Sequence, residues 1–166
     1  MPFDEIYHTH YRELRRFGRQ FNISPELTED LIQETFLRFY LELKNNVVFD
    51  NPRAWLYKVL INLFKTHLAK EKRAMNNFAS LKAGMNKPFD LHEEFVISEK
   101  QKIVFKMLEQ LPEKDKTLLL LYHSGLSYSE MAEAMAINPS SIGTMLVRAI
   151  GKLKKELKTH YHEMFE

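Results

Sequence analysis

Residues 125–142 constrain the fold of this chain more than any other stretch, because they contain two helix starts separated by a tight turn. Ser127 is followed three residues later by Glu130, the pattern of a capping box, in which each side chain satisfies a free N–H group at a helix start. Asn138 is a good second cap, and Pro139 after it has the φ angle that a first helical turn requires. The segment therefore predicts two consecutive helices.

Small side chains lie between these two starts. Ala132 and Ala136 allow two short helices to pack closely at a steep angle, which is the arrangement of a helix-turn-helix. The second helix of such a motif is the one that enters a DNA major groove. Taken alone, the segment leaves an ordinary helical hairpin as the alternative.

The helix that begins at Asn138 has an apolar face and a polar face. Its apolar residues recur at helical spacing at Ile142, Leu146, Ala149 or Ile150, and Leu153. Toward its start, where base edges would be met, the residues off this stripe are Ser140, Ser141, Thr144 and Arg148. The C-terminal half carries Lys152, Lys154, Lys155 and Lys158. These lysines suit DNA phosphates, whereas in a hairpin they would form a solvated face.

Basic charge is concentrated in one other segment. Residues 51–73 carry six Lys and Arg against one acidic residue, a net charge of +5 (6 − 1), although the whole chain has a net charge of only +2. Two separated basic helices are the pattern expected for two DNA contacts joined through a neutral scaffold.

Helical periodicity accounts for most of the chain, and no convincing period-2 strand pattern occurs. In the N-terminal half we expect helices over residues 3–21, 25–43 and 52–73, with a loop at residues 44–50. The expected inner face of the second helix consists of Leu27, Leu31, Thr35, Phe39 and Leu43. These three helices can share one core.

The pattern fades between residues 74 and 98, which we interpret as a flexible linker with a short helical turn around Phe78 and Leu81. It resumes at Glu99, stops at Leu111-Pro112 and restarts at Glu113. The predicted fold class is all-α: a domain of three to four helices at residues 1–73 and a helix-turn-helix domain at residues 99–166.

Several other functions find no support in the residues. The chain has no cysteine, and its paired histidines, at positions 8 and 10 and at 160 and 162, project about 200° apart on a helix and cannot chelate a metal from one face. No phosphate loop, nucleophile elbow or catalytic triad is recognisable. We therefore expect no enzyme, no cofactor, no metal site and no small-molecule substrate. An acidic start and the lack of a long apolar run predict a cytoplasmic protein without membrane insertion.

Two segments carry a family resemblance. Residues 28–40, TEDLIQETFLRFY, strongly resemble the polymerase-binding helix of bacterial sigma-70 family factors. Residues 51–63, NPRAWLYKVLINL, look like the family's promoter-recognising helix. With the helix-turn-helix last, the three motifs stand in the family's order over nearly the whole chain, and the small size points to the extracytoplasmic-function (ECF) group. The resemblance implies a dissociable RNA polymerase subunit that recognises promoters and helps to open DNA.

The resemblance also assigns roles to residues. Asp30, Gln33 and Glu34 match the patch that docks on the clamp helices of the polymerase beta-prime subunit, and the beta flap is a further implied contact. The implied contacts to the promoter's minus-10 element are Asn45, Asn46, Phe49, Arg53, Lys58, Asn62, Lys65, Lys70, Lys72 and Arg73. In the family, the loop at residues 44–50 captures a flipped base. The implied minus-35 contacts are Ser140, Ser141, Thr144, Arg148, Lys152 and Lys155. Many relatives also bind an anti-sigma factor.

Two departures from the family pattern bear on the second DNA contact. Gly143 and Met145 stand where basic residues are common, and Ala136 stands where the turn often has glycine. The second change is mild if Ala136 avoids a positive φ. Trp55 matches the promoter helix as well, but we favour a core role for it.

Two other functions remain as alternatives: a stand-alone helix-turn-helix regulator with an N-terminal sensing or dimerising domain, and an RNA-binding or structural helical protein.

Overall fold

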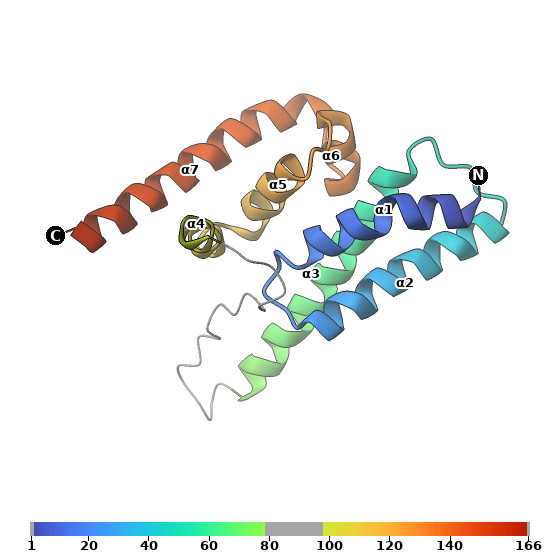
Figure 1. Cartoon of the computed structure of the whole chain (residues 1–166), viewed down its shortest axis with the longest axis horizontal. Coiled ribbons are helices and arrows are strands. Elements are labelled where there is room, and N and C mark those ends of the chain that lie inside the picture. Colours follow the sequence, from blue (N-terminus) through green and yellow to red (C-terminus); the bar gives the residue numbers. More distant parts are fainter. Residues whose placement is uncertain (1, 79–97, 166) are drawn as a thin grey trace. The chain divides into compact units, whose positions relative to one another are not determined.

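The computed structural model describes residues 2–78 and 98–165, and these form seven α-helices and no strand (Figure 1). The helices are α1 (Phe3–Gly18), α2 (Pro25–Lys44), α3 (Pro52–Phe78), α4 (Glu99–Glu109), α5 (Glu113–His123), α6 (Tyr128–Met135) and α7 (Pro139–Phe165). The chain divides into two compact units, Met1–Leu91 and His92–Glu166. The expected all-α class with two helical units is confirmed, whereas the domain limits at residues 73 and 99 stay predictions.

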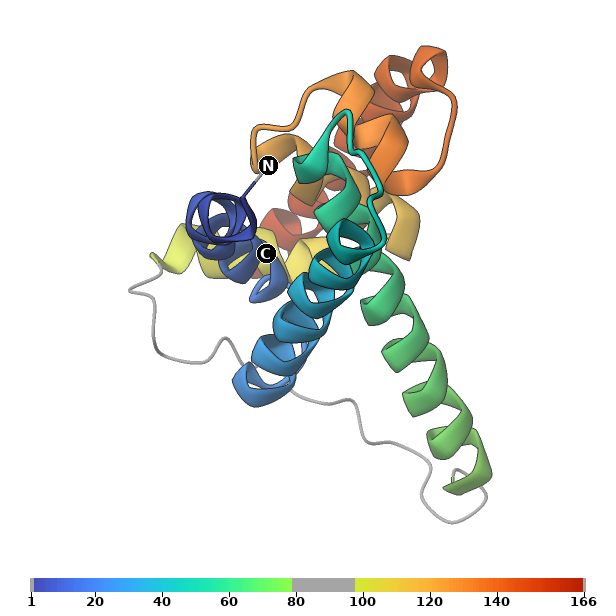
Figure 2. The ribbon, with the colours of Figure 1, turned by 90° about the vertical axis from the view of Figure 1, so that its right-hand side faces the viewer.

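The first unit is built from α1, α2 and α3, each of which contacts the other two (Figure 2). Aromatic side chains form a large part of its core: Phe17, Phe36, Phe39, Tyr57 and Phe64 are almost completely buried. Aliphatic residues complete it, among them Leu14, Ile32, Leu56, Leu60 and Ile61. Burial of this many large apolar groups is the main term that stabilises such a small unit.

The buried face of α2 differs from the expected one. Its buried residues are Thr28, Ile32, Thr35, Phe36 and Phe39, so the prediction was right for Thr35 and Phe39. Leu27, Leu31 and Leu43 are only half-buried, and their prediction as core was wrong. For Leu27 and Leu31 the reason is geometric: a four-residue spacing rotates by about 40° per step and carries them off the side that holds Ile32 and Phe39. Leu43 stays near the direction of Phe39 but lies one residue before the end of the helix.

The helix limits of the first unit follow from local contacts. The Ser24 side chain accepts a hydrogen bond from Leu27 N at 3.2 Å, as the predicted cap requires. The first helix ends at Gly18 and not at Phe21, because tighter turns follow in which Gln20 and Phe21 donate to carbonyls three residues back. The third helix continues past the expected end near Arg73 to Phe78, and Leu81 lies outside the described residues.

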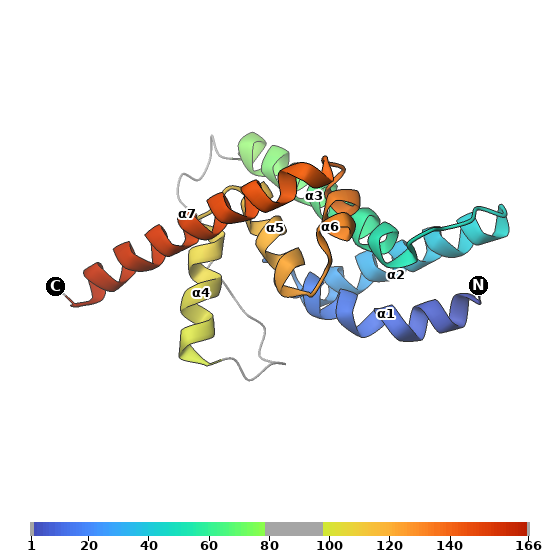
Figure 3. The same cartoon turned by 90° about the horizontal axis from the view of Figure 1, so that it is seen from above.

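The second unit is organised around α7, which contacts α4, α5 and α6 in turn (Figure 3). Its core includes Leu108, Leu118, Leu121, Met131 and Ile142. The predicted stripe of α7 is confirmed at Ile142, Leu146 and Ala149, whereas Ile150 and Leu153 are half-buried. An ion pair between the buried Lys116 and Glu109 joins α5 to α4.

The predicted helix-turn-helix consists of α6 and the start of α7. Ser127 and Glu130 form the capping box, with N–H···O distances of 2.8 and 3.1 Å, and Asn138 Oδ1 accepts from Ser140 N at 3.0 Å. In the turn, Ala136 adopts a left-handed conformation with φ 54° and ψ 47°. Alanine in place of glycine would be a mild change only if Ala136 avoided a positive φ, and it does not. The turn is therefore strained, because a Cβ in this region is crowded by the following carbonyl oxygen.

Replacing Ala136 with glycine should stabilise the second unit by about 0.5–1 kcal/mol, because glycine occupies the left-handed region without strain. Urea unfolding followed by far-UV circular dichroism measures this change. Lys154→Gly, at an exposed position inside α7 of the same unit, is the opposite-sign control and should cost about 0.5–1 kcal/mol. Destabilisation by Ala136→Gly would contradict the left-handed turn.

Candidate functional site

The first candidate surface is a polar face of α2. Asp30 and Gln33 are exposed, and Glu34 is partly exposed. Gln33 Nε2 donates to Glu29 Oε1 at 2.9 Å and to the Tyr7 hydroxyl at 3.4 Å, which ties this face to α1. Glu34 Oε1 lies 2.8 Å from Arg38 Nε. Asp30, Gln33 and Glu34 are thus brought together on one side of one helix, accessible to a partner.

Two exposed leucines that the sequence reasoning missed continue this face. Leu37 and Leu41 are 52% and 51% exposed. Leu37 follows Gln33 by four residues and Leu41 follows Leu37 by four, so they lie next to the polar group along the helix. The signal that could have found them is this spacing relative to Gln33. An apolar row beside polar and charged side chains is the combination of apolar core and polar rim found in protein–protein interfaces.

The loop between α2 and α3 presents asparagines to solvent but holds its aromatic side chain inward. Asn45 and Asn46 are exposed, and Asn46 adopts a positive φ of 61°. The Phe49 ring packs on Phe39 at a centroid distance of 4.8 Å and on Trp55 at 5.1 Å. Phe49 is therefore half-buried at the edge of the core, and Trp55, also half-buried, belongs to the same cluster.

The basic helix α3 presents most of its predicted DNA-contact residues to solvent. Lys58 is partly exposed, and the exposed residues are Asn62, Lys65, Lys70, Lys72 and Arg73. Lys58, Asn62 and Lys65 follow each other by four and three residues and share one side of the helix. The arrangement provides a strip of cations with an amide among them, which suits phosphates and an unstacked base.

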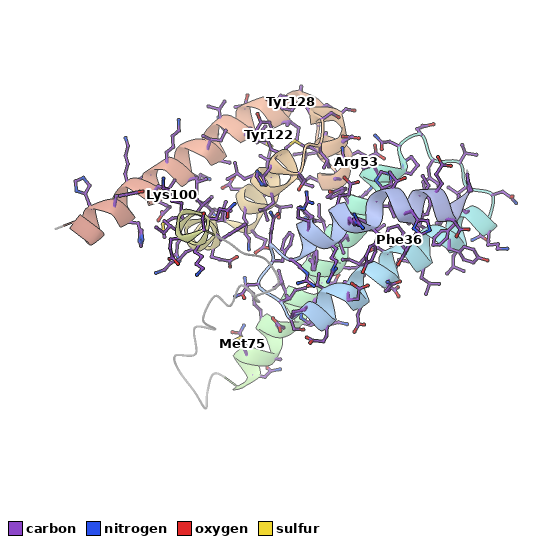
Figure 4. All side chains as sticks on the ribbon, viewed as in Figure 1. Phe36, Arg53, Met75, Lys100, Tyr122 and Tyr128 are labelled. Atoms are coloured by element: carbon purple, nitrogen blue, oxygen red, sulfur yellow. The ribbon has the colours of Figure 1, made fainter. Side chains whose placement is uncertain are left out.

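Arg53, which is labelled in Figure 4, lies at the start of α3 and has a partner within the first unit. Its guanidinium donates to the Glu13 carboxylate through Nε at 3.1 and 3.2 Å and through Nη2 at 2.9 Å, and both side chains are about one quarter exposed. Burial raises the pKa of Glu13, but hydrogen bonds from His10 and Arg53 and the Arg53 charge lower it by more, so this pKa lies below its ordinary value. The Glu13 carboxylate therefore stays charged, and the pair links α1 to α3.

The start of α7 presents the predicted base-contact residues in part. Ser140, Thr144 and Arg148 are exposed, whereas Ser141 is half-buried. Asn138 Oδ1 also accepts a hydrogen bond from the Ser140 hydroxyl at 2.9 Å. A Cβ at Gly143 would meet Tyr128 Cε2 at 3.6 Å, an ordinary contact, so the ring of Tyr128 lies beside position 143.

The two lysines predicted to follow these residues lie in different environments. Lys152 Nζ is 2.6 Å from Asp115 Oδ2, so this lysine connects α7 to α5, while Lys155 is exposed. Lys152 is therefore already paired with a carboxylate of its own unit. Within residues 2–78 and 98–165, none of the helices is long and apolar enough to cross a bilayer, and no metal-binding cluster of acidic and histidine side chains occurs.

Comparison with known proteins matches both units to one family. Residues 6–74 match Sigma-70 region 2, and residues 101–153 match Sigma-70, region 4. The chain is 28% identical over 162 residues to the ECF RNA polymerase sigma factor SigM of Bacillus subtilis, covering 93% of this chain and 94% of the relative. It is 29% identical over 132 residues to the ECF RNA polymerase sigma-E factor of Escherichia coli, covering 72% and 68%.

Two solved structures share the fold. The sigma factor RpoE of Bartonella quintana, in complex with the anti-sigma factor NepR, matches with a TM-score of 0.75 and 22% identity over 94% of this chain and 96% of that one. CnrH, in complex with the cytosolic domain of CnrY, matches with a TM-score of 0.65 and 20% identity over 95% and 88%. At such identities the likeness concerns the fold.

Proposed function

The chain belongs to the sigma-70 family and to its ECF group, and we propose which of its surfaces carry the work of a sigma factor. It is a promoter-directing subunit of RNA polymerase for transcription initiation, it binds core polymerase and promoter DNA, and it catalyses no reaction itself. Each of these contacts needs a surface of its own, and we propose which residues form each surface.

Core polymerase binds the exposed face of α2 in this proposal. Asp30, Gln33 and Glu34 supply acceptors and an amide for the beta-prime clamp helices, and Leu37 and Leu41 add apolar area beside them. Charged and polar groups that become buried against a partner fix the register of an interface, and apolar side chains next to them contribute to its stability. The beta flap is the second proposed contact of polymerase.

The minus-10 element lies along the loop and the basic face of α3. Asn45, Asn46 and Asn62 supply hydrogen-bonding groups for an unstacked base, and the cations on phosphates are Lys58, Lys65, Lys70, Lys72 and Arg73. Phe49 and Arg53 already have partners within the first unit. We therefore assign them to shaping this surface, Phe49 by supporting the loop and Arg53 by fixing the start of α3.

The minus-35 element meets the start of α7. Ser140, Ser141, Thr144 and Arg148 face the base edges, of which Arg148 is suited to a guanine, and Lys155 lies where phosphates would pass. Lys152 can join the phosphate contacts only by leaving Asp115. We propose the layout expected from the sequence: a polymerase and minus-10 domain at residues 1–73, a linker at 74–98, whose first residues continue α3 to Phe78, and a minus-35 domain at 99–166.

An anti-sigma factor is a further proposed partner, since both solved relatives described above are held in complexes, one of them explicitly with an anti-sigma factor. We place the protein in the cytoplasm, where bacterial polymerase and promoter DNA are found. A stand-alone regulator remains the second candidate only through the helix-turn-helix, because such a regulator needs neither the polar face of α2 nor the basic face of α3.

The observation that carries the proposal is that one chain presents the α2 face, the basic α3 face and the helix-turn-helix on two separate units. The isolated protein should bind promoter duplex weakly, because each unit alone offers few contacts. With core polymerase the two units are fixed at the spacing of the promoter elements, and binding becomes tight through effective concentration.

Duplex binding at physiological salt, with and without core polymerase, measures this difference. Lys70→Ala and Lys72→Ala test the phosphate contacts in the same assay. Each should weaken binding to all promoters about equally and lower the salt dependence of that binding, as the loss of a phosphate contact does. Tight, sequence-specific binding by the isolated protein, as a dimer on a palindrome, would instead establish the stand-alone regulator.

A further inference from the structure

Val147 is an apolar side chain on the outward face of α7, in the N-terminal half of the helix. Val147 is 72% exposed, and it follows the exposed Thr144 by three residues and precedes the exposed Arg148. The opposite face of the helix is buried through Ile142, Leu146 and Ala149, so the orientation of α7 is fixed by the core. Val147 therefore shares the face that, under the proposed function, meets the minus-35 element.

The neighbours of Val147 on this face leave room for close approach. Gly151, four residues further on, is exposed, and a Cβ placed there would meet nothing within 4 Å. Ser140 and Thr144 are also small. Arg148 is the only charged side chain among Ser140, Thr144, Val147, Arg148 and Gly151. A face with so little bulk can lie nearer to base edges than one covered by long basic side chains.

The chemistry of the major groove limits what an exposed valine can recognise there. Base edges present hydrogen-bond donors and acceptors, and the apolar group among them is the C5-methyl of thymine. A valine side chain can neither donate nor accept a hydrogen bond, so its favourable contact is with that methyl. We propose that Val147 is a specificity-determining residue that contacts the C5-methyl of one thymine in the minus-35 element, an inference that rests on the proposed role of α7.

The experiment uses core polymerase with the full chain. A duplex library randomised at minus-35 first yields the preferred element, and each of its thymines is then replaced by deoxyuridine, which removes only the methyl group. The wild-type holoenzyme should lose about fourfold in affinity at one thymine, the value expected for one buried methyl group. Holoenzyme with Val147→Ala should bind the thymine duplex more weakly and should lose nothing further with deoxyuridine at that position.

Val104→Ala, an exposed valine of α4 outside the outward face of α7, is the matched control and should respond to deoxyuridine as the wild type does. The proposal is overturned if Val147→Ala leaves affinity unchanged, or if that variant loses as much as the wild type on every deoxyuridine duplex. Arg148→Ala tests the minus-35 role of α7 separately from the methyl contact of Val147. If Arg148→Ala leaves the affinity unchanged and the library selection yields no preferred minus-35 sequence, α7 does not read this element. The proposal for Val147 then fails as well.

Discussion

Core RNA polymerase should bind the Asp30→Ala/Gln33→Ala variant about 30-fold or more weakly than the wild-type chain. Both residues are exposed on α2, so their replacement leaves the core of the first unit intact. Truncating polar and charged groups that pair across a buried interface costs about 2–5 kcal/mol, and each 1.4 kcal/mol is a factor of ten in affinity. Competition binding with labelled chain and purified core enzyme measures the loss.

Asp4→Ala is the matched control, because Asp4 is an exposed carboxylate on α1, outside the α2 face. It should bind core polymerase as the wild type does. The single tryptophan, Trp55, lies in the aromatic cluster of the first unit, so its fluorescence shows whether each variant is folded. Unchanged affinity of a folded Asp30→Ala/Gln33→Ala variant would refute the docking surface on α2.

Features set by neighbouring residues could be predicted from the sequence. Ser24 before Pro25, Ser127 with Glu130, and Asn138 all cap helices where expected, because a cap depends on groups within three positions of each other. The apolar stripe of α7 was also predictable, since Ile142, Leu146 and Ala149 stay in phase over two turns. The order of the helices followed from these starts.

Contacts between distant residues could not be predicted in this way. Arg53 fits a basic promoter helix by sequence, yet its partner Glu13 is forty positions away. Lys152 resembles its neighbouring lysines, but Asp115 lies thirty-seven positions before it. Phe49 is turned inward by Phe39 and Trp55, which only the fold brings together. Likewise, the identity of the buried side of α2 depends on what α1 and α3 offer to it.

Gly18 is another residue whose role could not be predicted from the sequence, because that role depends on distant residues that pack against it. It is buried at the end of α1, and a Cβ there would lie 2.8 Å from Thr28 Cγ2 and 3.2 Å from Phe64 Cζ. Thr28 is itself buried, and its hydroxyl donates to Ser24 O at 3.0 Å, which holds the methyl group in place. A side chain at position 18 therefore requires either that Thr28 gives up this rotamer and its hydrogen bond or that α1 and α2 move apart.

Gly18→Ala should therefore destabilise the first unit by about 1–3 kcal/mol, the usual cost of overpacking a core, despite the better helix propensity of alanine. Urea unfolding followed by Trp55 fluorescence reports on this unit. Gly151→Ala is the control: it lies in the second unit with no atom within 4 Å of the added Cβ, and it should leave the Trp55 transition unchanged.

Thr28→Ser tests the cause of the Gly18→Ala loss, because serine keeps the hydroxyl that bonds to Ser24 but lacks the methyl group that blocks a Cβ. Thr28→Ser alone should cost about 1 kcal/mol for the missing methyl group. In that background, Gly18→Ala should cost much less than in the wild type, since the 3.2 Å approach to Phe64 is then the tightest of the remaining contacts and Ile32 Cδ1 lies at an ordinary 3.8 Å. Such coupling is expected for residues in direct contact. Equal losses in both backgrounds would mean that the close approach of α1 and α2 at Gly18 does not set the cost.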